Sequence, residues 1–284
     1  MQMEKGGLRW GVERRLAFIE TRLFWEGGVN RADLVGTFDV SVPQASKDLS
    51  LYQEQVPNNL RYDAARKRYV AADTFAPQFI KLDADAYLRD RVGMKGEAAA
   101  EELVSAERLP IPTRRIDPEA LRLIVAAIRE GQSVEINYQS MSQNRPEPFW
   151  RRVSPHAFAH DGMRWHVRAY CHRDNRFLDF IVSRCLEARD LDAQAKSRAD
   201  DVVWNDCFDV VLSPNPMLSP SQQRIVADDY GMTKGEVAIP VRRALLYYFN
   251  KRLRLDVGGD RAGETPIVVK NRAAFDAALA EAAQ

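Results

Sequence analysis

Cysteine is scarce in this chain of 284 residues, which contains only Cys171, Cys185 and Cys207. A small, odd number without a C-x-x-C pair excludes a disulfide framework and argues against a structural zinc site. Apolar runs are short as well, and none approaches the roughly 18 residues that a membrane span needs. The first residues also lack the apolar region of a secretion signal. We therefore expect a soluble protein of the reducing cytoplasm with no membrane partner.

Catalytic signatures are absent too. The sequence has no G-x-x-x-x-G-K-[ST] phosphate loop, no G-x-S-x-G nucleophile turn, no H-E-x-x-H motif and no paired-glycine dinucleotide fingerprint. A nuclease that binds metal through carboxylates would need acids clustered on strands, whereas the strand-like segments here carry bases. We expect a protein that is not an enzyme and that uses no cofactor.

Neither basic nor acidic residues are in excess over the whole chain, and its formal net charge is +1. This excludes a uniformly basic coat, so any contact with nucleic acid has to come from local patches. One patch lies between residues 145 and 184, which hold eight arginines against four acids, together with all four histidines of the chain. This mid-chain segment is the positive region that the near-neutral total conceals.

The N-terminal part has the pattern of a helix-turn-helix. Apolar residues at steps of three and four predict an amphipathic helix over residues 8–26. Two short helices follow over residues 31–38 and from residue 42 to about residue 55, and they are separated by a tight turn. Two short strands, residues 60–62 and 68–71, then form a hairpin with a basic tip. Such a hairpin directly after a helix-turn-helix is typical of a winged helix.

Local signals mark the ends of the two short helices. Asn30 and Ser41 are suited to cap them, and Pro43 falls in the first turn, where a missing N–H costs nothing. Asp39 suits the turn because it tolerates the left-handed conformation.

The rest of the chain divides at polar and proline-rich segments. Residues 75–104 are helical in composition, and a stretch with three prolines, residues 107–118, is the best linker candidate. A capped helix over residues 117–131 is followed by strand-like pieces with turns between them, as in a small all-β barrel or sheet. The polar residues 189–201 mark another boundary. Strands and helices then alternate in an α+β domain of about 80 residues.

Three separated motifs in this order resemble the WYL-domain transcriptional regulators. They are the N-terminal winged helix, the central "RWHVRAYC" and the tail motif "YGMTKGEVAIPVRRALLYY". The resemblance points in particular to the CapW and BrxR type, which represses phage-defence operons. It implies a homodimer, a Sm-like five-stranded barrel, and a C-terminal extension called WCX. The triplet that names the family reads Trp165-His166-Val167 here, with histidine at the tyrosine position.

The fold class expected from pattern and resemblance together is α+β multidomain. The predicted domains are a winged helix-turn-helix DNA-binding domain over residues 1–74, a helical linker over 75–118, a WYL domain over 119–200 and a WCX-like α+β domain over 201–284.

In a helix-turn-helix the second helix places its N-terminal residues at base edges in the major groove. Gln44 can read adenine with its amide, and Lys47 can contact guanine or a phosphate. The basic hairpin tip would neutralise backbone phosphates, a contribution that weakens with salt. The predicted DNA-binding residues are Ser41, Gln44, Ser46, Lys47, Arg66, Lys67 and Arg68. The alternative is a helical protein-interaction module with a solvated basic turn.

The strand over residues 164–170 alternates between two faces. We expect Trp165, Val167 and Ala169 in the core. The opposite face carries cations and a phenol, which costs desolvation free energy unless it meets water or an anion. Arginine forks match phosphate, and aromatic neighbours can stack bases. That face consists of Arg164, His166, Arg168 and Tyr170.

The resemblance places an effector site in the same region. We expect an anionic ligand, either a nucleotide or a short single-stranded DNA or RNA. The predicted ligand-binding residues are Tyr138, Ser140, Ser142, Arg152, His156, Arg164, His166, Arg168 and Arg184. The alternative is that these cations form a solvated outer face, or pair with Asp174, Asp179 and acids of the tail.

Two further alternatives concern this region. His156 and His160 would lie about 13 Å apart along a strand, too far to bind one metal ion, so no metal is expected. The second alternative is a constitutive architectural DNA-binding protein that has no effector. This alternative gives no reason for Arg164, His166, Arg168 and Tyr170 to share one face.

Our hypothesis from the sequence is a homodimeric repressor that binds an inverted-repeat operator in double-stranded DNA. Binding of the anionic effector would change the relative placement of the two winged helices and so weaken operator binding. A ligand-dependent activator of the same family is the alternative. The apolar helix over residues 242–253 serves either dimerisation or the packing of its own domain.

Overall fold

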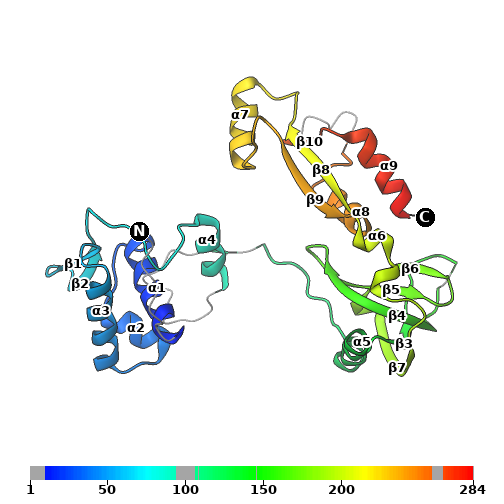
Figure 1. Ribbon diagram of the computed structural model, residues 1–284, viewed down its shortest axis with the longest axis horizontal. Helices are drawn as coiled ribbons and strands as arrows, with labels where there is room; N and C mark the ends of the chain where they lie inside the picture. Colours follow the sequence, from blue (N-terminus) through cyan, green and yellow to red (C-terminus); the bar gives the residue numbers. More distant parts are fainter. Residues whose placement is uncertain (1–9, 94–105, 108, 145, 258–264, 284) are drawn as a thin grey trace. The chain divides into compact units, whose positions relative to one another are not determined.

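The computed structural model describes residues 10–93, 106–107, 109–144, 146–257 and 265–283 (Figure 1). The chain divides into two compact units, Met1–Pro110 and Ile111–Gln284. The first unit has one hydrophobic core, and the second unit has two.

The first unit is a helix-turn-helix followed by a two-stranded hairpin, as the sequence predicts. Its elements are α1 (Trp10–Trp25), α2 (Arg31–Phe38), α3 (Val42–Gln55), β1 (Leu60–Asp63), β2 (Arg68–Ala71) and α4 (Ala84–Gly93). Helix α1 packs against α3, and Leu16, Ile19, Leu34 and Tyr52 are completely buried at the centre. The start of the predicted first helix, residues 8 and 9, lies outside the described residues.

The two helices of the motif begin at the predicted capping residues. Asn30 accepts a hydrogen bond from the Asp33 N–H, and the Asp33 carboxylate accepts one from the Asn30 N–H, which completes a capping box. Ser41 caps α3 by accepting the Gln44 N–H. Asp39 has a φ of 51°, the left-handed conformation expected at this turn. Local sequence therefore sets where the recognition helix begins.

The segment after the hairpin differs from the prediction of a helix over residues 75–104. Residues 75–83 form no helix, and the amides of residues 78–80 have another acceptor. The completely buried carboxylate of Glu20 on α1 accepts hydrogen bonds from the backbone N–H groups of residues 78–80. Helix α4 begins only afterwards, and residues 94–104 lie outside the described residues.

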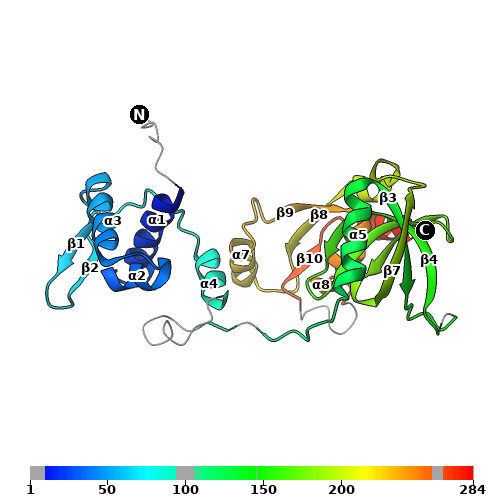
Figure 2. The same ribbon diagram turned by 90° about the horizontal axis from the view of Figure 1, so that it is seen from below.

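The second unit begins with α5 (Pro118–Glu130), which is capped by Asp117 and ends at the left-handed Gly131 as predicted. The helix packs against a five-stranded antiparallel sheet (Figure 2). The strands are β3 (Gln132–Tyr138), β4 (Phe149–His160), β5 (Trp165–Cys171), β6 (Arg176–Ile181) and β7 (Cys185–Ala193). Their order in the sheet is β6-β5-β4-β3-β7.

Strand β7 is missing from the sequence prediction, which places a boundary at residues 189–201. The strand is mostly exposed and charged because it lies at the edge of the sheet. It pairs with β3 from the Gln132↔Ala193 pair to the Tyr138↔Cys185 pair. Among the described strands no ladder joins β6 to β7. The five-stranded sheet is therefore established, and its closure into a Sm-like barrel stays a prediction.

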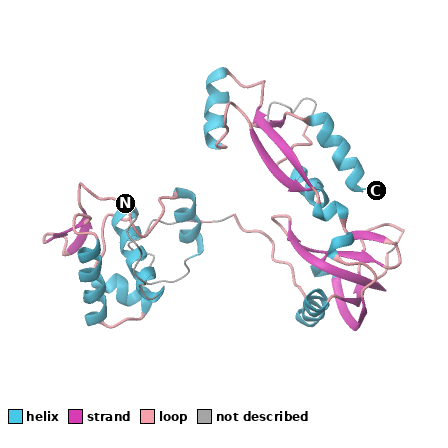
Figure 3. Cartoon of the chain, viewed as in Figure 1, coloured by secondary structure: helices cyan, strands magenta, loops and turns pink. Residues whose placement is uncertain are grey.

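The remainder of the second unit alternates strands and helices, as predicted. Its elements are α6 (Val202–Asn205), β8 (Cys207–Pro214), α7 (Pro220–Asp229), β9 (Val237–Arg242), α8 (Leu246–Arg252), β10 (Ile267–Val269) and α9 (Arg272–Ala283). The three strands form an antiparallel sheet with the order β10-β8-β9 (Figure 3). Leu246 of α8 and Phe275 and Ala278 of α9 are buried in the core of this sheet. The short helix α6 was not predicted.

Strand β5 follows the predicted alternation only in part. Val167 and Ala169 lie in the core, as expected. Trp165 was expected there too, but its exposed fraction is 50%. It lies at the hairpin end of the strand, where its ring centroid is 4.7 Å from that of His160. On the opposite face His166 and Arg168 are buried, with exposed fractions of 2% and 6%. This second face is therefore not a solvated one.

We predict that Glu20→Ala lowers the free energy of unfolding of the first unit by about 2–3 kcal/mol, because three backbone N–H groups lose a charged acceptor. Urea unfolding followed by circular dichroism measures the change. The matched control is Glu13→Ala on the exposed face of the same helix, which should cost less than about 0.5 kcal/mol. Equal stability of the two variants would contradict the role given to Glu20.

Candidate DNA interface and ligand site

The N-cap and first two turns of α3 carry four of the predicted DNA-binding residues, Ser41, Gln44, Ser46 and Lys47. Lys47 is exposed. The Ser41 side chain caps the helix, and the Ser46 hydroxyl donates to the Val42 carbonyl oxygen over 3.0 Å. Gln44 is half-buried, and its side-chain Nε2 donates to Asp48 Oδ1 over 3.0 Å. Of these four residues, Lys47 is therefore the exposed cation, the hydroxyls of Ser41 and Ser46 bond the helix backbone, and the amide of Gln44 bonds a carboxylate.

The carboxylate that Gln44 contacts, Asp48, is not among the residues predicted from the sequence. Asp48 is buried, and both of its oxygens accept hydrogen bonds from Arg15 of α1, over 2.7 Å at Oδ2 and 3.2 Å at Oδ1. The i, i+4 spacing of Gln44 and Asp48 on a helix is the signal that could have found the contact. The arginine comes from a different helix and is not visible in local sequence.

The hairpin tip presents the wing cations. Asp63 accepts hydrogen bonds from the backbone N–H groups of Ala65 and Arg66, and Lys67 has a left-handed φ of 51°. This turn leaves Arg66 and Lys67 exposed. Arg68 differs, because its Nη2 donates to the Gly28 carbonyl oxygen over 2.5 Å. Arg68 thus joins the wing to the loop before α2.

The nine predicted ligand-binding residues fall into separate groups. One group lies at the end of β3 and in the 3-10 turn Val182–Arg184. The Gln139 N–H donates to the Arg184 carbonyl oxygen, and the Ser142 N–H donates to the Ser140 hydroxyl. Tyr138 precedes them with a buried ring. The members of this group are Tyr138, Ser140, Ser142 and Arg184.

Burial governs the titration of the phenol in this group. It raises the pKa of Tyr138, while a hydrogen bond from the Ile181 N–H and the positive charge of Arg184 act in the opposite direction. The charge of Arg184 therefore acts on the Tyr138 hydroxyl. It forms the positive end of the group.

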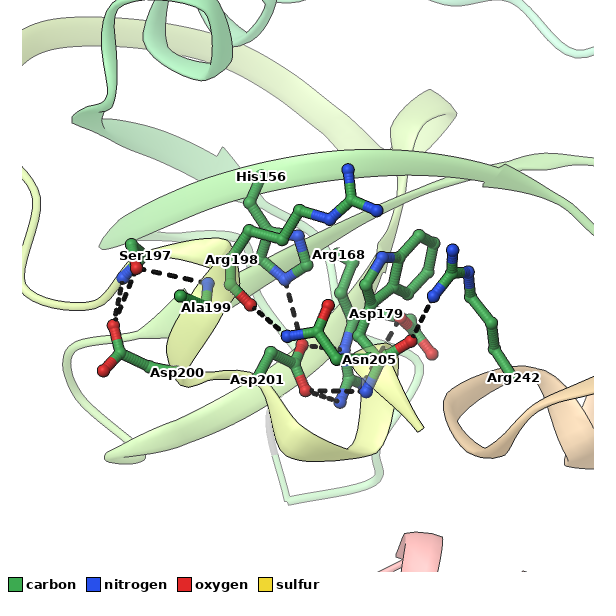
Figure 4. Close-up of polar contacts among 11 residues, drawn as sticks. His156, Arg168, Asp179, Ser197, Arg198, Ala199, Asp200, Asp201, Asn205 and Arg242 are labelled. Atoms are coloured by element: carbon green, nitrogen blue, oxygen red, sulfur yellow. Dashed lines mark hydrogen bonds and ion pairs between the residues drawn. The ribbon is translucent and has the colours of Figure 1, made fainter. Parts of the chain in front are cut away.

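A second group surrounds Asp201, which is 1% exposed. From adjacent strands, His156 and Arg168 point toward it (Figure 4). His156 Nε2 lies 2.9 Å from Asp201 Oδ2, and Arg168 donates through Nε and Nη2 over 2.8 and 3.2 Å. Arg168 also lies 3.4 Å from Asp179 Oδ1. Two of the predicted anion-binding cations are thus held by carboxylates of the chain itself.

A third group surrounds Asp161 in the turn between β4 and β5. Arg164 Nε and His166 Nε2 each lie 2.9 Å from Asp161 Oδ2. Burial acts to raise the pKa of Asp161, but hydrogen bonds from His166, from Arg164 and from backbone N–H groups outweigh it and lower that pKa. The imidazole ring of His166 also packs against Tyr248 of α8, with ring centroids 4.5 Å apart.

Arg152 is the ninth residue and lies apart from these groups. It donates to the Ser133 hydroxyl and to the Asp190 carbonyl oxygen, and its Nη2 lies 3.7 Å from Glu135 Oε1. The alternative of internal pairing therefore describes Arg152, His156, Arg164, His166 and Arg168. The sequence analysis names Asp174, Asp179 and acids of the tail as possible partners, but it does not single out Asp161 or Asp201.

A cavity of about 250 Å³ lies between the β4–β5 hairpin and α8. Its lining is mainly aliphatic and aromatic and includes His166, Tyr248 and Phe249. Arg252 of α8 reaches across to donate to the Asp161 carbonyl oxygen over 3.2 Å. Only one of the predicted ligand-binding residues lines the cavity, so it is not the predicted anion site.

Two searches of the described part of the chain were negative. It holds no group of three or more His, Cys, Asp or Glu side chains arranged to bind a metal ion. It also holds no helix with the length and apolar character that crossing a membrane requires.

Three family models match successive parts of the chain. The BrxR transcriptional regulator winged helix-turn-helix domain matches residues 11–90, and the WYL domain matches residues 119–190. The BrxR transcriptional regulator C-terminal dimerization domain matches residues 207–275. The first match covers the helix-turn-helix and wing. The second covers α5 and most of the five-stranded sheet, and the third covers most of the three-stranded sheet and its helices.

Several similar proteins are named DNA-binding transcriptional repressor CapW. The one from Pseudomonas aeruginosa is 39% identical over 93% of this chain and 89% of its own length. The one from Stenotrophomonas maltophilia is 37% identical, over 95% and 93%, and the one from Escherichia coli (strain KTE188) is 36% identical, over 89% and 86%. A solved structure, proteasome accessory factor B/C (PafBC) of Arthrobacter aurescens, covers 95% of this chain and 48% of that chain. Its 18% identity and TM-score of 0.25 carry no structural argument.

We predict that the second unit loses stability in acid through Asp201. Burial acts to raise the pKa of this carboxyl, but hydrogen bonds from His156 and Arg168 lower it to about 2, from 3.8 in the unfolded chain. The ionised form therefore contributes about 2 kcal/mol above pH ~4, and this contribution disappears as the pH falls through about 2.

The measurement is the free energy of unfolding between about pH 5 and pH 2 for the wild type and Asp201→Asn. The variant should lack the Asp201 part of the slope and should be less stable by about 3 kcal/mol at pH 7, because the buried Arg168 then loses its two charged hydrogen bonds to Asp201 and keeps the longer contact with Asp179. Asp229→Asn, at an exposed position, is the control and should keep the wild-type slope. An unchanged slope in Asp201→Asn would contradict the assignment.

Proposed function

Because the chain belongs to the family of CapW-type DNA-binding transcriptional repressors, with BrxR-type winged-helix and C-terminal dimerization domains, we propose a specific regulatory role for it. It binds an inverted-repeat operator of an anti-phage defence operon as a homodimer in the cytoplasm, where that DNA lies. An anionic ligand bound by the WYL domain weakens operator binding.

The proposal that the protein binds operator DNA through α3 and the wing is supported mainly by the pattern of exposed cations. Lys47 on α3 and Arg66 and Lys67 on the wing are exposed. In this class of motif, the recognition helix reads base edges while the wing contacts the backbone. We propose Gln44 and Lys47 as base-reading residues, Arg66 and Lys67 as phosphate contacts, and Ser41, Ser46 and Arg68 as residues that shape the interface.

Dimerisation explains the symmetry of the proposed operator. Two copies of a winged helix related by a two-fold axis read two half-sites of opposite direction. The match of the C-terminal part to a dimerization domain supports this arrangement. We place the functional domains at residues 1–74, 75–118, 119–200 and 201–284, and we propose that β6 and β7, joined by a three-residue 3-10 turn, close the sheet into a Sm-like barrel.

The proposed ligand site is centred on the group at the end of β3. Arg184 offers a guanidinium, and its carbonyl oxygen accepts a hydrogen bond from the Gln139 N–H next to Tyr138, while Ser140 and Ser142 offer hydroxyls. A phosphate matches such a guanidinium fork. The ligand class that fits is a nucleotide or a short single strand of DNA or RNA. Arg152, His156, Arg164, His166 and Arg168 join the site only where a ligand displaces the carboxylates that now hold them.

We predict different defects for the helix and the wing in gel shifts with operators selected from random duplexes. Lys47→Ala should lose about tenfold or more in affinity for the selected sequence. The Arg66→Ala/Lys67→Ala variant should weaken binding to all duplexes alike and reduce the slope of log affinity against log salt by about one for each lost phosphate contact.

The control for this comparison is Arg89→Ala, which removes an exposed arginine of α4 and should bind like the wild type. Size-exclusion chromatography should show the same dimer for every variant. Wild-type affinity in Lys47→Ala would place the operator contact elsewhere.

We predict that Arg184→Ala keeps operator affinity within about twofold of wild type and fails to release an operator-controlled reporter in phage-infected cells, because the proposed ligand loses its charge partner. Arg189→Ala, an exposed arginine of β7, is the matched control and should release the reporter normally. Normal release in Arg184→Ala would remove this residue from the effector site, and loss of operator binding would indicate a second DNA contact surface.

A further inference from the structure

Two residues of the recognition helix α3 and one residue of α1 are joined by hydrogen bonds: Gln44, Asp48 and Arg15. Arg15 of α1 donates to both carboxylate oxygens of Asp48, and Gln44 Nε2 donates to one of them. The side chain of Asp48 is 2% exposed and that of Arg15 is 15% exposed. The carboxylate is therefore held in place before any DNA arrives.

The chemistry of Asp48 settles the orientation of the Gln44 amide. An ionised carboxylate only accepts hydrogen bonds, and the Arg15 guanidinium keeps a full positive charge beside it. Of the two ends of the Gln44 amide, only the nitrogen can face Asp48. The amide oxygen is thereby directed away from the carboxylate, together with at most one remaining N–H.

The four bases respond differently to an amide held in this way. Adenine presents the N6 amino group as donor beside the N7 acceptor in the major groove, which suits an amide oxygen and an N–H side by side. Guanine presents two acceptors, O6 and N7, and one of them would face the amide oxygen without a hydrogen bond. A fixed amide therefore discriminates between the two purines, whereas a freely turning one can present its nitrogen to guanine.

We propose that Asp48, held by Arg15, is a positioning residue that fixes the Gln44 amide and makes it select adenine over guanine at one base pair of each half-site. This inference rests on the proposed operator binding through α3. A role limited to tying α1 to α3 does not account for the third contact, because Arg15 alone already bonds both oxygens of Asp48.

The test uses the full chain and operators selected from random duplexes. Affinity is then measured for the four duplexes that differ only at the base pair whose discrimination disappears in Gln44→Ala. The wild type should prefer adenine over guanine there by about tenfold. In Asp48→Asn the preference should fall below about threefold, because asparagine can present either its oxygen or its nitrogen to Gln44.

A double-mutant cycle separates positioning from general stability. The Gln44→Ala/Asp48→Asn variant should show the same lack of discrimination as Gln44→Ala alone, because both changes remove one shared function. The control Glu26→Gln breaks the buried ion pair between Arg91 and Glu26 in the same unit, outside α2 and α3 and without touching Gln44. It should leave the base preference at wild-type level. Circular dichroism establishes that each variant is folded.

If Asp48→Asn does not fold, Arg15→Lys replaces the two-point contact by a single charge, and its adenine preference should fall between the values for wild type and Gln44→Ala. A wild-type preference in the folded Asp48→Asn or Arg15→Lys variant would overturn the positioning role, as would an equal loss of affinity for all four duplexes. A wild-type protein that selects no sequence at all would instead overturn the proposed operator binding.

Discussion

The ion pair between Arg168 and Asp201 determines how the five-stranded sheet joins the rest of the second unit. Asp201 is nearly inaccessible and also accepts hydrogen bonds from His156 and from the Trp204 N–H. The same carboxylate therefore neutralises Arg168 of the sheet, accepts a hydrogen bond from His156 and caps α6, the α-helix that follows the sheet. A buried charge without such partners would cost several kcal/mol, so the sheet and the following helix fold in one relative position.

The first unit uses buried charges in the same way, with α1 as the common support. Arg15 holds Asp48 on the recognition helix, and Arg22 lies 3.0 Å from Asp33 in the capping box of α2. Glu20 binds the backbone after the wing. Three residues on one helix thus fix both helices of the motif and the segment that follows. Through these contacts the helices of this short domain, which has a modest core, are held in one relative arrangement.

Sequence predicted the features that depend on near neighbours. The caps at Asn30 and Ser41, the left-handed Asp39 and the hairpin wing follow from residues within one or two turns. It did not predict contacts made between distant segments. Composition favoured a helix at residues 75–83, but the amides of residues 78–80 bind Glu20 instead. The cationic face of β5 looked like a ligand surface because Asp201, 33 positions after Arg168, could not be placed opposite it.

The magnitudes constrain how a ligand could act in the proposed repressor. Allosteric coupling is typically worth about 1–3 kcal/mol, whereas removing one partner of a buried ion pair costs about 3–5 kcal/mol. A coupling of this size from a ligand that contacts Arg184 alone is smaller than the cost of separating Arg168 from Asp201. Tyr248 bonds Asp179 and Arg252 bonds the Asp161 carbonyl oxygen, so α8 is attached to the same sheet. The sheet and the C-terminal part have to move together, and the flexible point of the switch has to lie outside these contacts.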